Sequence, residues 1–358
     1  MNTKKHFTVL AVALLASAML TACTPDAEDY EPYESASYEA YAEEQAYEAY
    51  AEEQTYAYNV EDYEPYNIED YEPYEPATHE AYVDIPFMWL VTSPSGQTMY
   101  MFGSIHAATH DLYPLSPIIM DAFRRSDYLM REGAGPESYS FADFMLADGR
   151  TITDYIPSEL HQRAMSVVKE YENHFPRQLV ASVEELDNYH PYIWWSVLTR
   201  MAADKSRLSF EAGLDAFFMR QAVRNNMEIL WAEYPSGYVE PAINMSLALH
   251  LQFLENSLDI SGGAESLERL YGMWRRGDDQ GLLDEFYRSL EAFGCAELAM
   301  EFRDAALTRR DLQMAGRAQY FMAEGKNVFF VAGAYHMLVE NGIIDLLVQR
   351  GYSVERIQ

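Results

Sequence analysis

Cysteine is nearly absent from this chain, which has only 2 in 358 residues, Cys23 and Cys295. A metal site built from several thiolates, such as a four-cysteine zinc cluster, is therefore excluded. Cys295 has apolar neighbours, Phe293 and Leu298, and we expect it to be a small buried residue.

Long apolar runs are also missing. The longest near the start, Val9–Met19, follows Lys4 and Lys5 and is too short to cross a bilayer as a stable helix. This order is typical of a secretory signal, and the Leu-Thr-Ala-Cys sequence that ends at Cys23 resembles a bacterial lipobox. We therefore predict a signal peptide over residues 1–23, lipidation of Cys23 and an extracytoplasmic protein anchored to the bacterial cell membrane; an ordinary cleaved signal is the alternative.

Residues 24–84 contain no lysine or arginine but 20 Asp and Glu, together with many tyrosines. The sequence EDYEPY occurs there three times, starting at Glu28, Glu61 and Glu69. So little aliphatic surface and so much like charge predict a disordered acidic tether, about 40–50 Å long at random-coil scaling. A tyrosine and carboxylate ladder that binds cations or wall polymer is the alternative.

Basic charge is scarce in the rest of the chain as well. Removing the 20 acidic residues of the tether, and Lys4 and Lys5, leaves 37 acidic and 23 basic residues from Ile85 onward, a net charge of −14. Nucleic-acid binding depends on basic surface, so we expect no nucleic-acid partner.

Residues 85–358 are long enough for one large α/β domain. Strand-like apolar runs cover 87–91, 98–102, 127–132, 227–233, 328–332 and 352–357. Helical spacing covers 114–125, 213–226, 240–258, 265–275, 280–293, 342–349, much of 138–207, and 296–324, which is long enough to be broken or bent. Strands alternating with helices predict a mostly parallel central sheet with an N-terminal hairpin, helices on both faces and a large helical insertion over 138–207.

Two predicted strands end in the same way. The strand 98–102 runs into Gly103 and, three residues later, His106; the strand 328–332 runs into Gly333 and His336. In each copy the glycine allows a sharp turn or a close backbone approach, and the histidine follows the carboxyl end of the strand, where open α/β sheets bind ligands.

Two other strands end in carboxylates, Glu132 and Glu233. Histidines and carboxylates at one sheet edge suit a metal site with N and O ligands, or a hydrolytic site that activates water. Glu132 is alternatively a solvated strand end, and Glu233 alternatively pairs with an arginine in a structural ion pair.

The chain resembles the TraB/PrgY/GumN family. The resemblance rests on GSIH, YPL and DYLMRE near residues 103–132, GLDAFFMRQA at 213–222, MWRRGD at 273–278, and TRRDLQMAGRA, GKNVFFVAGAYHM and NGIIDLLVQRGYSV at 308–354. Members are similar to the Tiki proteins, which are metal-dependent proteases, and more distantly to erythromycin esterases and haem-binding ChaN proteins. The resemblance implies an α/β fold with His106, His336 and Glu132 at the active site, where Gly103 and Gly333 shape the turns.

Three further positions match the family in part. Glu233 stands where many members have a glutamate, in a different local sequence. Arg310 matches an arginine that is usually followed by asparagine, whereas this chain has Asp311. Arg310 is expected to hold a carboxylate ligand or grip a substrate carboxylate, or else to be an exposed helix residue. Asp215 matches a helix start, where capping explains it as well as chemistry does.

The resulting hypothesis is a cell-surface metallohydrolase, a peptidase acting on a peptide or protein. His106, His336 and Glu132 are the expected ligands of a divalent ion such as Mn²⁺, Co²⁺ or Zn²⁺, with Glu233, or else Glu132, as general base. The alternatives are a lipoprotein that captures a peptide without turnover and, more weakly, one that captures haem or iron.

Overall fold

The computed structural model describes residues 87–133, 144–147, 149–177, 180–233 and 244–357. The predicted signal and tether lie outside the described residues, as do parts of the helical stretches predicted over 138–207 and 240–258. Within the described ranges, none of the helices combines the length and the apolar character that crossing a membrane requires.

A six-stranded sheet forms the centre of the described part of the molecule, in the order β4-β3-β5-β2-β1-β6. The strands are β1 (Met88–Thr92), β2 (Thr98–Ser104), β3 (Tyr128–Arg131), β4 (Glu228–Trp231), β5 (Val328–Gly333) and β6 (Ser353–Ile357). The pairs β2–β5, β5–β3 and β3–β4 are parallel, whereas β1 pairs antiparallel with both β2 and β6. The predicted α/β class, mostly parallel sheet and N-terminal hairpin are confirmed.

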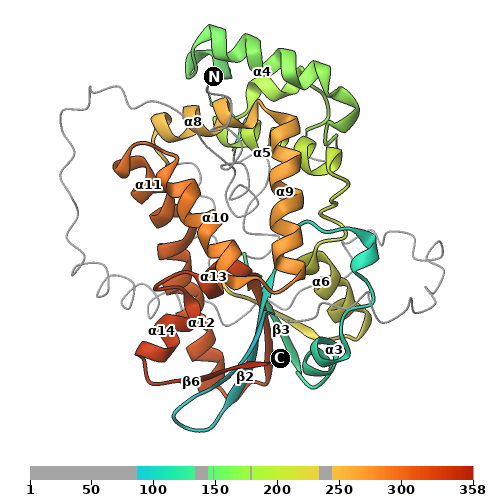
Figure 1. The fold of residues 1–358 in the computed structure, drawn as a ribbon, viewed down its shortest axis with the longest axis vertical. Coiled ribbons are helices and arrows are strands. Elements are labelled where there is room, and N and C mark those ends of the chain that lie inside the picture. Colours follow the sequence, from blue (N-terminus) through green and yellow to red (C-terminus); the bar gives the residue numbers. More distant parts are fainter. Residues whose placement is uncertain (1–86, 134–143, 148, 178–179, 234–243, 358) are drawn as a thin grey trace.

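Helices cover both faces of this sheet (Figure 1). On one face lie α3 (Pro117–Arg124) and α6 (Leu214–Arg224), and on the other lie α12 (Arg309–Ala323) and α14 (Ile343–Gln349). Phe329 of β5 fixes the first face, because its ring lies 5.6 Å from Phe123 of α3 and 4.9 Å from Phe218 of α6. The strand β5 is buried along its whole length, as its continuous apolar run predicts.

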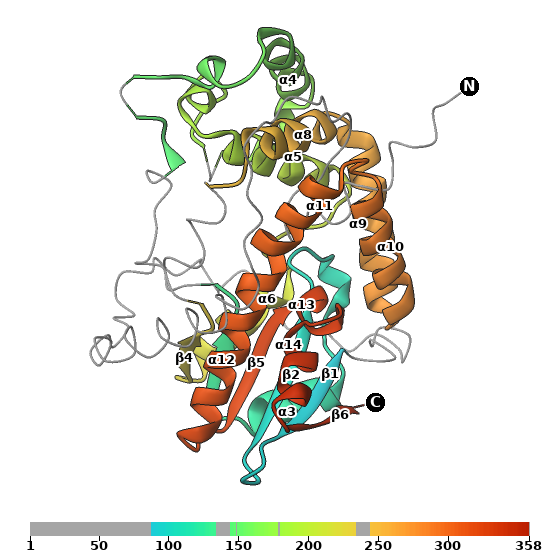
Figure 2. The same ribbon diagram turned by 90° about the vertical axis from the view of Figure 1, so that its left-hand side faces the viewer.

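A helical layer lies beyond the sheet (Figure 2). It contains α4 (Ser158–Glu170), α5 (Pro191–Lys205), α8 (Leu247–Ser257), α9 (Ile260–Arg275), α10 (Asp279–Glu291) and α11 (Ala296–Arg303). The described helices of the predicted insertion, α4 and α5, lie in the distal part, where Trp195 stacks on Phe253 of α8. It is α9 and α10 that contact the strand ends: Trp274 of α9 donates to the carbonyl of Gly103 at 2.9 Å.

At the level of single elements, one prediction agrees with the structure and others differ. The long stretch 296–324 is interrupted, as expected, by a π-helical turn at Asp304–Thr308 between α11 and α12. The helix α9 begins five residues earlier than predicted, because Asp259 caps the backbone N–H of Gly262. A short helix, α13 (Ala334–Leu338), follows β5 directly. Cys295, which we predicted to be buried, is only half-buried at the start of α11.

Candidate functional site

Four neighbouring parallel strands deliver the predicted site residues to one edge of the sheet. In the order β4, β3, β5 and β2, the segments after the strands carry Glu233, Glu132, His336 and His106. A hydrogen bond joins two of these strand ends: the N–H of Gly333, the last residue of β5, donates to Oε2 of Glu132 at 2.7 Å. The predicted convergence at the carboxyl ends of the strands is therefore present.

Glu132 lies between the two histidines. Its Oε2 is 3.7 Å from Nε2 of His106, and its Oε1 is 3.4 Å from Nε2 of His336. The two imidazoles thus face the two oxygens of one carboxylate. Glu132 is 9% exposed, so the alternative that it is a solvated strand end is wrong.

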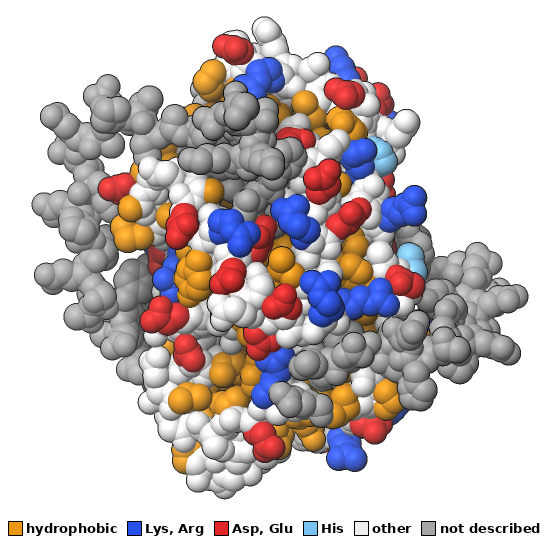
Figure 3. All heavy atoms as spheres, in the orientation of Figure 1, with side chains coloured by type: hydrophobic (Ala, Val, Ile, Leu, Met, Phe, Trp, Pro, Cys, Tyr) orange, Lys and Arg blue, Asp and Glu red, His pale blue; other side chains and the backbone are white. Residues whose placement is uncertain are grey.

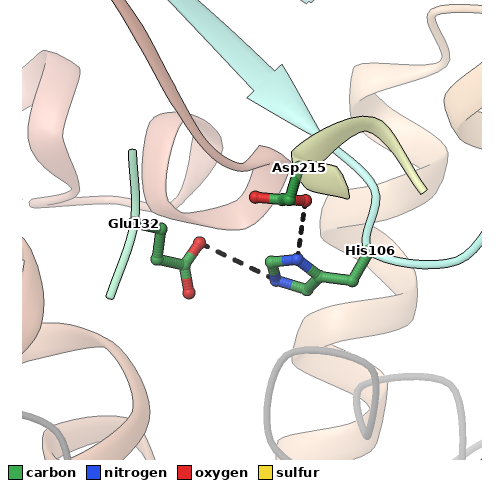
Figure 4. A group of neighbouring side chains, drawn as sticks. All are labelled: His106, Glu132 and Asp215. Carbon is green, nitrogen blue, oxygen red and sulfur yellow. Dashed lines mark hydrogen bonds and ion pairs between the residues drawn. The ribbon is translucent and has the colours of Figure 1, made fainter. Parts of the chain in front are cut away.

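Asp215, at the start of α6, orients His106 (Figure 4). Its Oδ2 lies 2.8 Å from Nδ1 of His106 and accepts a hydrogen bond from Ser104 Oγ at 3.0 Å. The helix start is held against the histidine loop, since Leu214 N–H donates to the carbonyl of Ile105. Asp215 makes no side-chain capping bond to α6, so the capping alternative is wrong and its contacts are with the site.

Asp311 of α12 plays the same part for His336. Its Oδ1 lies 2.5 Å from Nδ1 of His336, and both side chains are buried. In both pairs the carboxylate accepts from Nδ1, so that Nε2 faces Glu132 and offers its lone pair there when the imidazole is neutral. This carboxylate–histidine arrangement is the one that fixes the tautomer of metal-ligating histidines.

Arg310, next to Asp311, joins the two glutamates. Its guanidinium binds both oxygens of Glu233, from Nε at 2.7 Å and from one terminal nitrogen at 2.9 Å. That terminal nitrogen also donates to Oε1 of Glu132 at 2.6 Å, and the other lies 3.4 Å from Nε2 of His336. Arg310 is buried, so the exposed alternative is wrong, and the structural ion pair left open for Glu233 is present.

The first glycine of the repeated motif, Gly103, lies close to neighbouring backbone. Neither Gly103 nor Gly333 has a positive φ. A Cβ on Gly103 would lie 3.1 Å from both the Cα of Ala334 and the Cβ of Phe87, so a larger residue there would push these neighbours away by a few tenths of an ångström. A positive φ of 93° occurs instead at Gly133, whose N–H donates to Oε2 of Glu233 at 2.6 Å.

The site is electrostatically coupled. Burial alone would lower the pKa of His336, but the negative charges of Glu132 and Asp311 outweigh it and raise this pKa to about 9. Burial likewise opposes charge on His106, yet Asp215 and Glu132 raise its pKa. The pKa of Glu132 is held well below its usual range despite burial, by His336, Arg310 and His106 in that order.

The donor set fits a divalent cation. Within the described ranges, His106, Glu132 and Asp215 have ligand atoms within 4.8 Å of one another. We assign Asp215 to orientation because its oxygen already accepts from Nδ1 of His106. Four carboxylates of formal charge −1, Glu132, Glu233, Asp215 and Asp311, surround one guanidinium, so with neutral histidines three negative charges remain. Such an excess attracts a cation.

From the sequence, the role of Asp215 is open between helix capping and chemistry, and Asp311 has no assigned role. Asp215 matched only a helix start, and Asp311 was noted only as a departure from the asparagine usual in the family. The sequence offered one indication, since each aspartate lies in a predicted helix within or next to a segment that resembles the family. Which histidine nitrogen an aspartate reaches depends on how its helix packs against the sheet.

Comparisons with known proteins show which family the chain is related to. The Metalloprotease TIKI2 of Xenopus tropicalis is 22% identical to the chain over 314 residues, which cover 75% of the chain and 59% of that protein. The chain therefore spans less than two thirds of its relative. No solved structure matches significantly. The model of the TraB/PrgY/gumN family matches residues 87–356, and the chain belongs to this family.

Proposed function

We propose that this protein is a metal-dependent hydrolase that cleaves peptide bonds. One observation carries the proposal: the Nε2 atoms of His106 and His336 face the same carboxylate, while an aspartate holds each Nδ1. Imidazole nitrogens oriented in this way, together with a carboxylate, are the ligands used by Mn²⁺, Co²⁺ and Zn²⁺. The relative named a metalloprotease supports the same reaction class.

His106, His336 and Glu132 would hold the ion. When bound, the ion supplies Lewis acidity toward a carbonyl oxygen and lowers the pKa of a water. Asp215 and Asp311 keep the ring orientation and the tautomer. Arg310 fixes the rotamer of Glu132 through the 2.6 Å hydrogen bond to its Oε1.

Glu233 and Glu132 are the two candidate general bases. Glu233 is the base that the sequence favours, but both of its oxygens are bound by Arg310, and one also accepts from Gly133. A base must reach the proton that it abstracts. These contacts support Glu233 as the anchor of Arg310. Glu132 is the alternative base, but one carboxylate does not easily serve as both a tight ligand of the ion and a base. Glu233 serves as base only if Arg310 moves away from it.

A second function, capture of a peptide without turnover, is favoured by the position of Arg310. Its guanidinium is 3.4 Å from Nε2 of His336, where a cation would repel a bound divalent ion. Unit charges about 4 Å apart interact by about 4 kcal/mol at an effective dielectric constant near 20. A guanidinium is also suited to a peptide carboxylate.

We further propose that the protein is a lipoprotein held at the bacterial cell surface by Cys23, with residues 24–84 as the tether. The leader sequence and the acidic composition of 24–84 support this. On the face of the domain shown in Figure 3, basic and acidic side chains are interspersed, which gives a nucleic acid no uniform basic surface on that face. Peptide or protein is the partner that we propose.

The decisive experiment measures cleavage and binding with the same protein. The full chain is incubated with a peptide library and with Mn²⁺, Co²⁺ or Zn²⁺, and products are read by mass spectrometry. We expect cleavage that disappears in His106→Ala and His336→Ala but persists in His110→Ala, which alters an exposed histidine nearby. Retained peptide without product under every metal would support capture and reject the hydrolase.

A further inference from the structure

A small pocket lies beside His106, between the strand ends and the helical layer. Its volume is about 30 Å³, and it is bounded by Ser104 at the end of β2 and the following Ile105 and His106, by Ala334 and Tyr335 of α13, and by α9 and α10. The side chain of His106 is 24% exposed, whereas those of Glu132, His336 and Arg310 are at most 10% exposed. A substrate that reaches the site therefore meets His106 and this pocket together.

The walls of the pocket are apolar. Leu270 and Trp274 of α9 and Leu282 of α10 form the side made by the helical layer. Trp274 is held in place by its hydrogen bond to Gly103, and Tyr335 packs against Phe286 of α10 with ring centroids 5.3 Å apart. Both walls are therefore held in place, and close-packed side chains of this kind move little to accommodate a larger group.

The size of the pocket limits what enters it. A volume of about 30 Å³ is roughly two to three times the 10–15 Å³ that a cavity needs to hold one water molecule. A methyl or hydroxymethyl group fits such a space, whereas a leucine or phenylalanine side chain requires the wall to move. Apolar walls also disfavour a charged group, which would lose its hydration without a partner.

We infer that this pocket is the subsite for the substrate side chain next to the scissile peptide bond, and that it admits only a small uncharged side chain such as that of alanine or serine. The inference rests on the proposed peptide substrate. Leu282 is the size-determining residue, because it lies on the wall contributed by α10 and takes no part in the hydrogen bonds and ion pairs that hold Glu132 and the two histidines.

Substitution of Leu282 in opposite directions tests the inference. Leu282→Ala enlarges the pocket and Leu282→Phe fills it. Peptides that differ at one position (Gly, Ala, Ser, Val, Leu or Phe) are compared for retention by the full chain and, where cleavage occurs, for kcat/KM. We expect the unmodified protein to prefer Ala and Ser, and Leu282→Ala to shift the ratio of Val or Leu to Ala by about 10–200-fold, the range typical of methylene-sized differences. Leu282→Phe should shift preference toward Gly.

A matched control separates the subsite from general loosening of the helix layer. Leu267→Ala removes an equally buried leucine from α9, one turn from Leu270, outside the pocket lining. Its selectivity should equal that of the unmodified protein. Side-chain selectivity that is absent, or that changes equally in Leu267→Ala and Leu282→Ala, overturns the inference. Retention is scored without turnover, so a protein that selects small side chains but yields no product rejects the hydrolase and keeps the subsite.

Discussion

Arg310 is the residue on which the charge balance of the site depends. Its guanidinium contacts Glu132, Glu233 and His336. Burial alone would lower the pKa of Arg310, but the negative charges of Glu233 and Glu132 raise it. Removing one partner of a buried ion pair leaves an uncompensated charge, which costs far more than the pair contributes.

Arg310→Met should therefore lower the free energy of unfolding by about 3–5 kcal/mol, measured by urea denaturation at neutral pH. Arg309→Met is the control, because the ion pair of Arg309 with Asp304 is largely exposed and should cost about 1 kcal/mol or less. Equal losses in the two variants would contradict a central role for Arg310.

Asp311 is expected to set the charge of His336 as well as its orientation. Asp311→Asn keeps an oxygen that accepts from Nδ1 but removes the negative charge, so we expect the His336 pKa to fall from its raised value of about 9, measured by NMR titration. Asp311→Ala removes the acceptor and should weaken metal binding by about 10–100-fold in calorimetry. Equal metal affinity in the alanine variant and the unmodified protein would show that Asp311 does not position the ligand.

His336 should make the metal-free protein less stable at alkaline pH. Its folded pKa, about 9, is above the ordinary value of 6.5, so its stabilising contribution is complete below about pH 6.5 and is lost as the pH rises through 9. With a chelator present, the difference in unfolding free energy between the unmodified protein and His336→Gln should shrink by on the order of 3 kcal/mol from pH 6 to pH 9.5. A difference for His336→Gln that stays constant over this pH range would be the contrary result.

At the scale of secondary-structure elements, the packing of α6 and α12 against the strand ends determines where Asp215 and Asp311 lie. The helix α6 can bring Asp215 to His106 only because Gly213 has no side chain: a Cβ there would lie 1.9 Å from the carbonyl oxygen of His106. The π-helical turn at Asp304–Thr308 precedes Arg310 and Asp311 on α12, and π turns are frequent at functional sites.

A pair of glycine substitutions tests this docking. Gly213→Ala should lower the melting temperature and weaken metal binding, because α6 and the loop of His106 must separate. Gly316→Ala, in the interior of α12, meets nothing within 4 Å and should stabilise the protein by about 0.5–1 kcal/mol. Thermal unfolding and metal titration of both variants give the comparison; a harmless Gly213→Ala would refute the close contact.

The whole molecule places the site between the sheet and the helical layer, with α9 and α10 contributing the walls next to His106. In the proposed lipoprotein this domain is carried on an acidic segment of some 60 residues, residues 24–84, and reaches substrates in or near the cell wall. The anchor should depend on one of the two cysteines.

Cys23→Ala should abolish incorporation of labelled fatty acid in a bacterial host and move the protein out of the membrane fraction. Cys295→Ala should retain both properties, because it leaves the leader sequence unchanged. Fractionation and labelling measure the result; persistent labelling of the Cys23 variant would disprove the lipobox assignment.

Much of the architecture can be read from the chain because it depends on local pattern. The apolar runs ending at Gly103 and Gly333 specify buried parallel strands, and parallel strands bring their carboxyl ends to one edge. His106, His336, Glu132 and Glu233 therefore meet there, as predicted. The start of α9 differs from the prediction because Gly262 and Gly263 have low helix propensity, whereas in the folded protein the cap and the packing of α9 stabilise the helix there.

The contacts of the site required the folded molecule. Whether Glu233 faces a substrate or an arginine depends on the docking of α12, 77 residues further along the chain, and the sequence left both readings open. The same holds for Asp215 and Asp311, whose roles follow from which imidazole each helix brings within reach. Residue types and strand ends are encoded locally, whereas pairing between distant elements is settled when their apolar faces pack, because burial of those faces determines which charged groups are desolvated together.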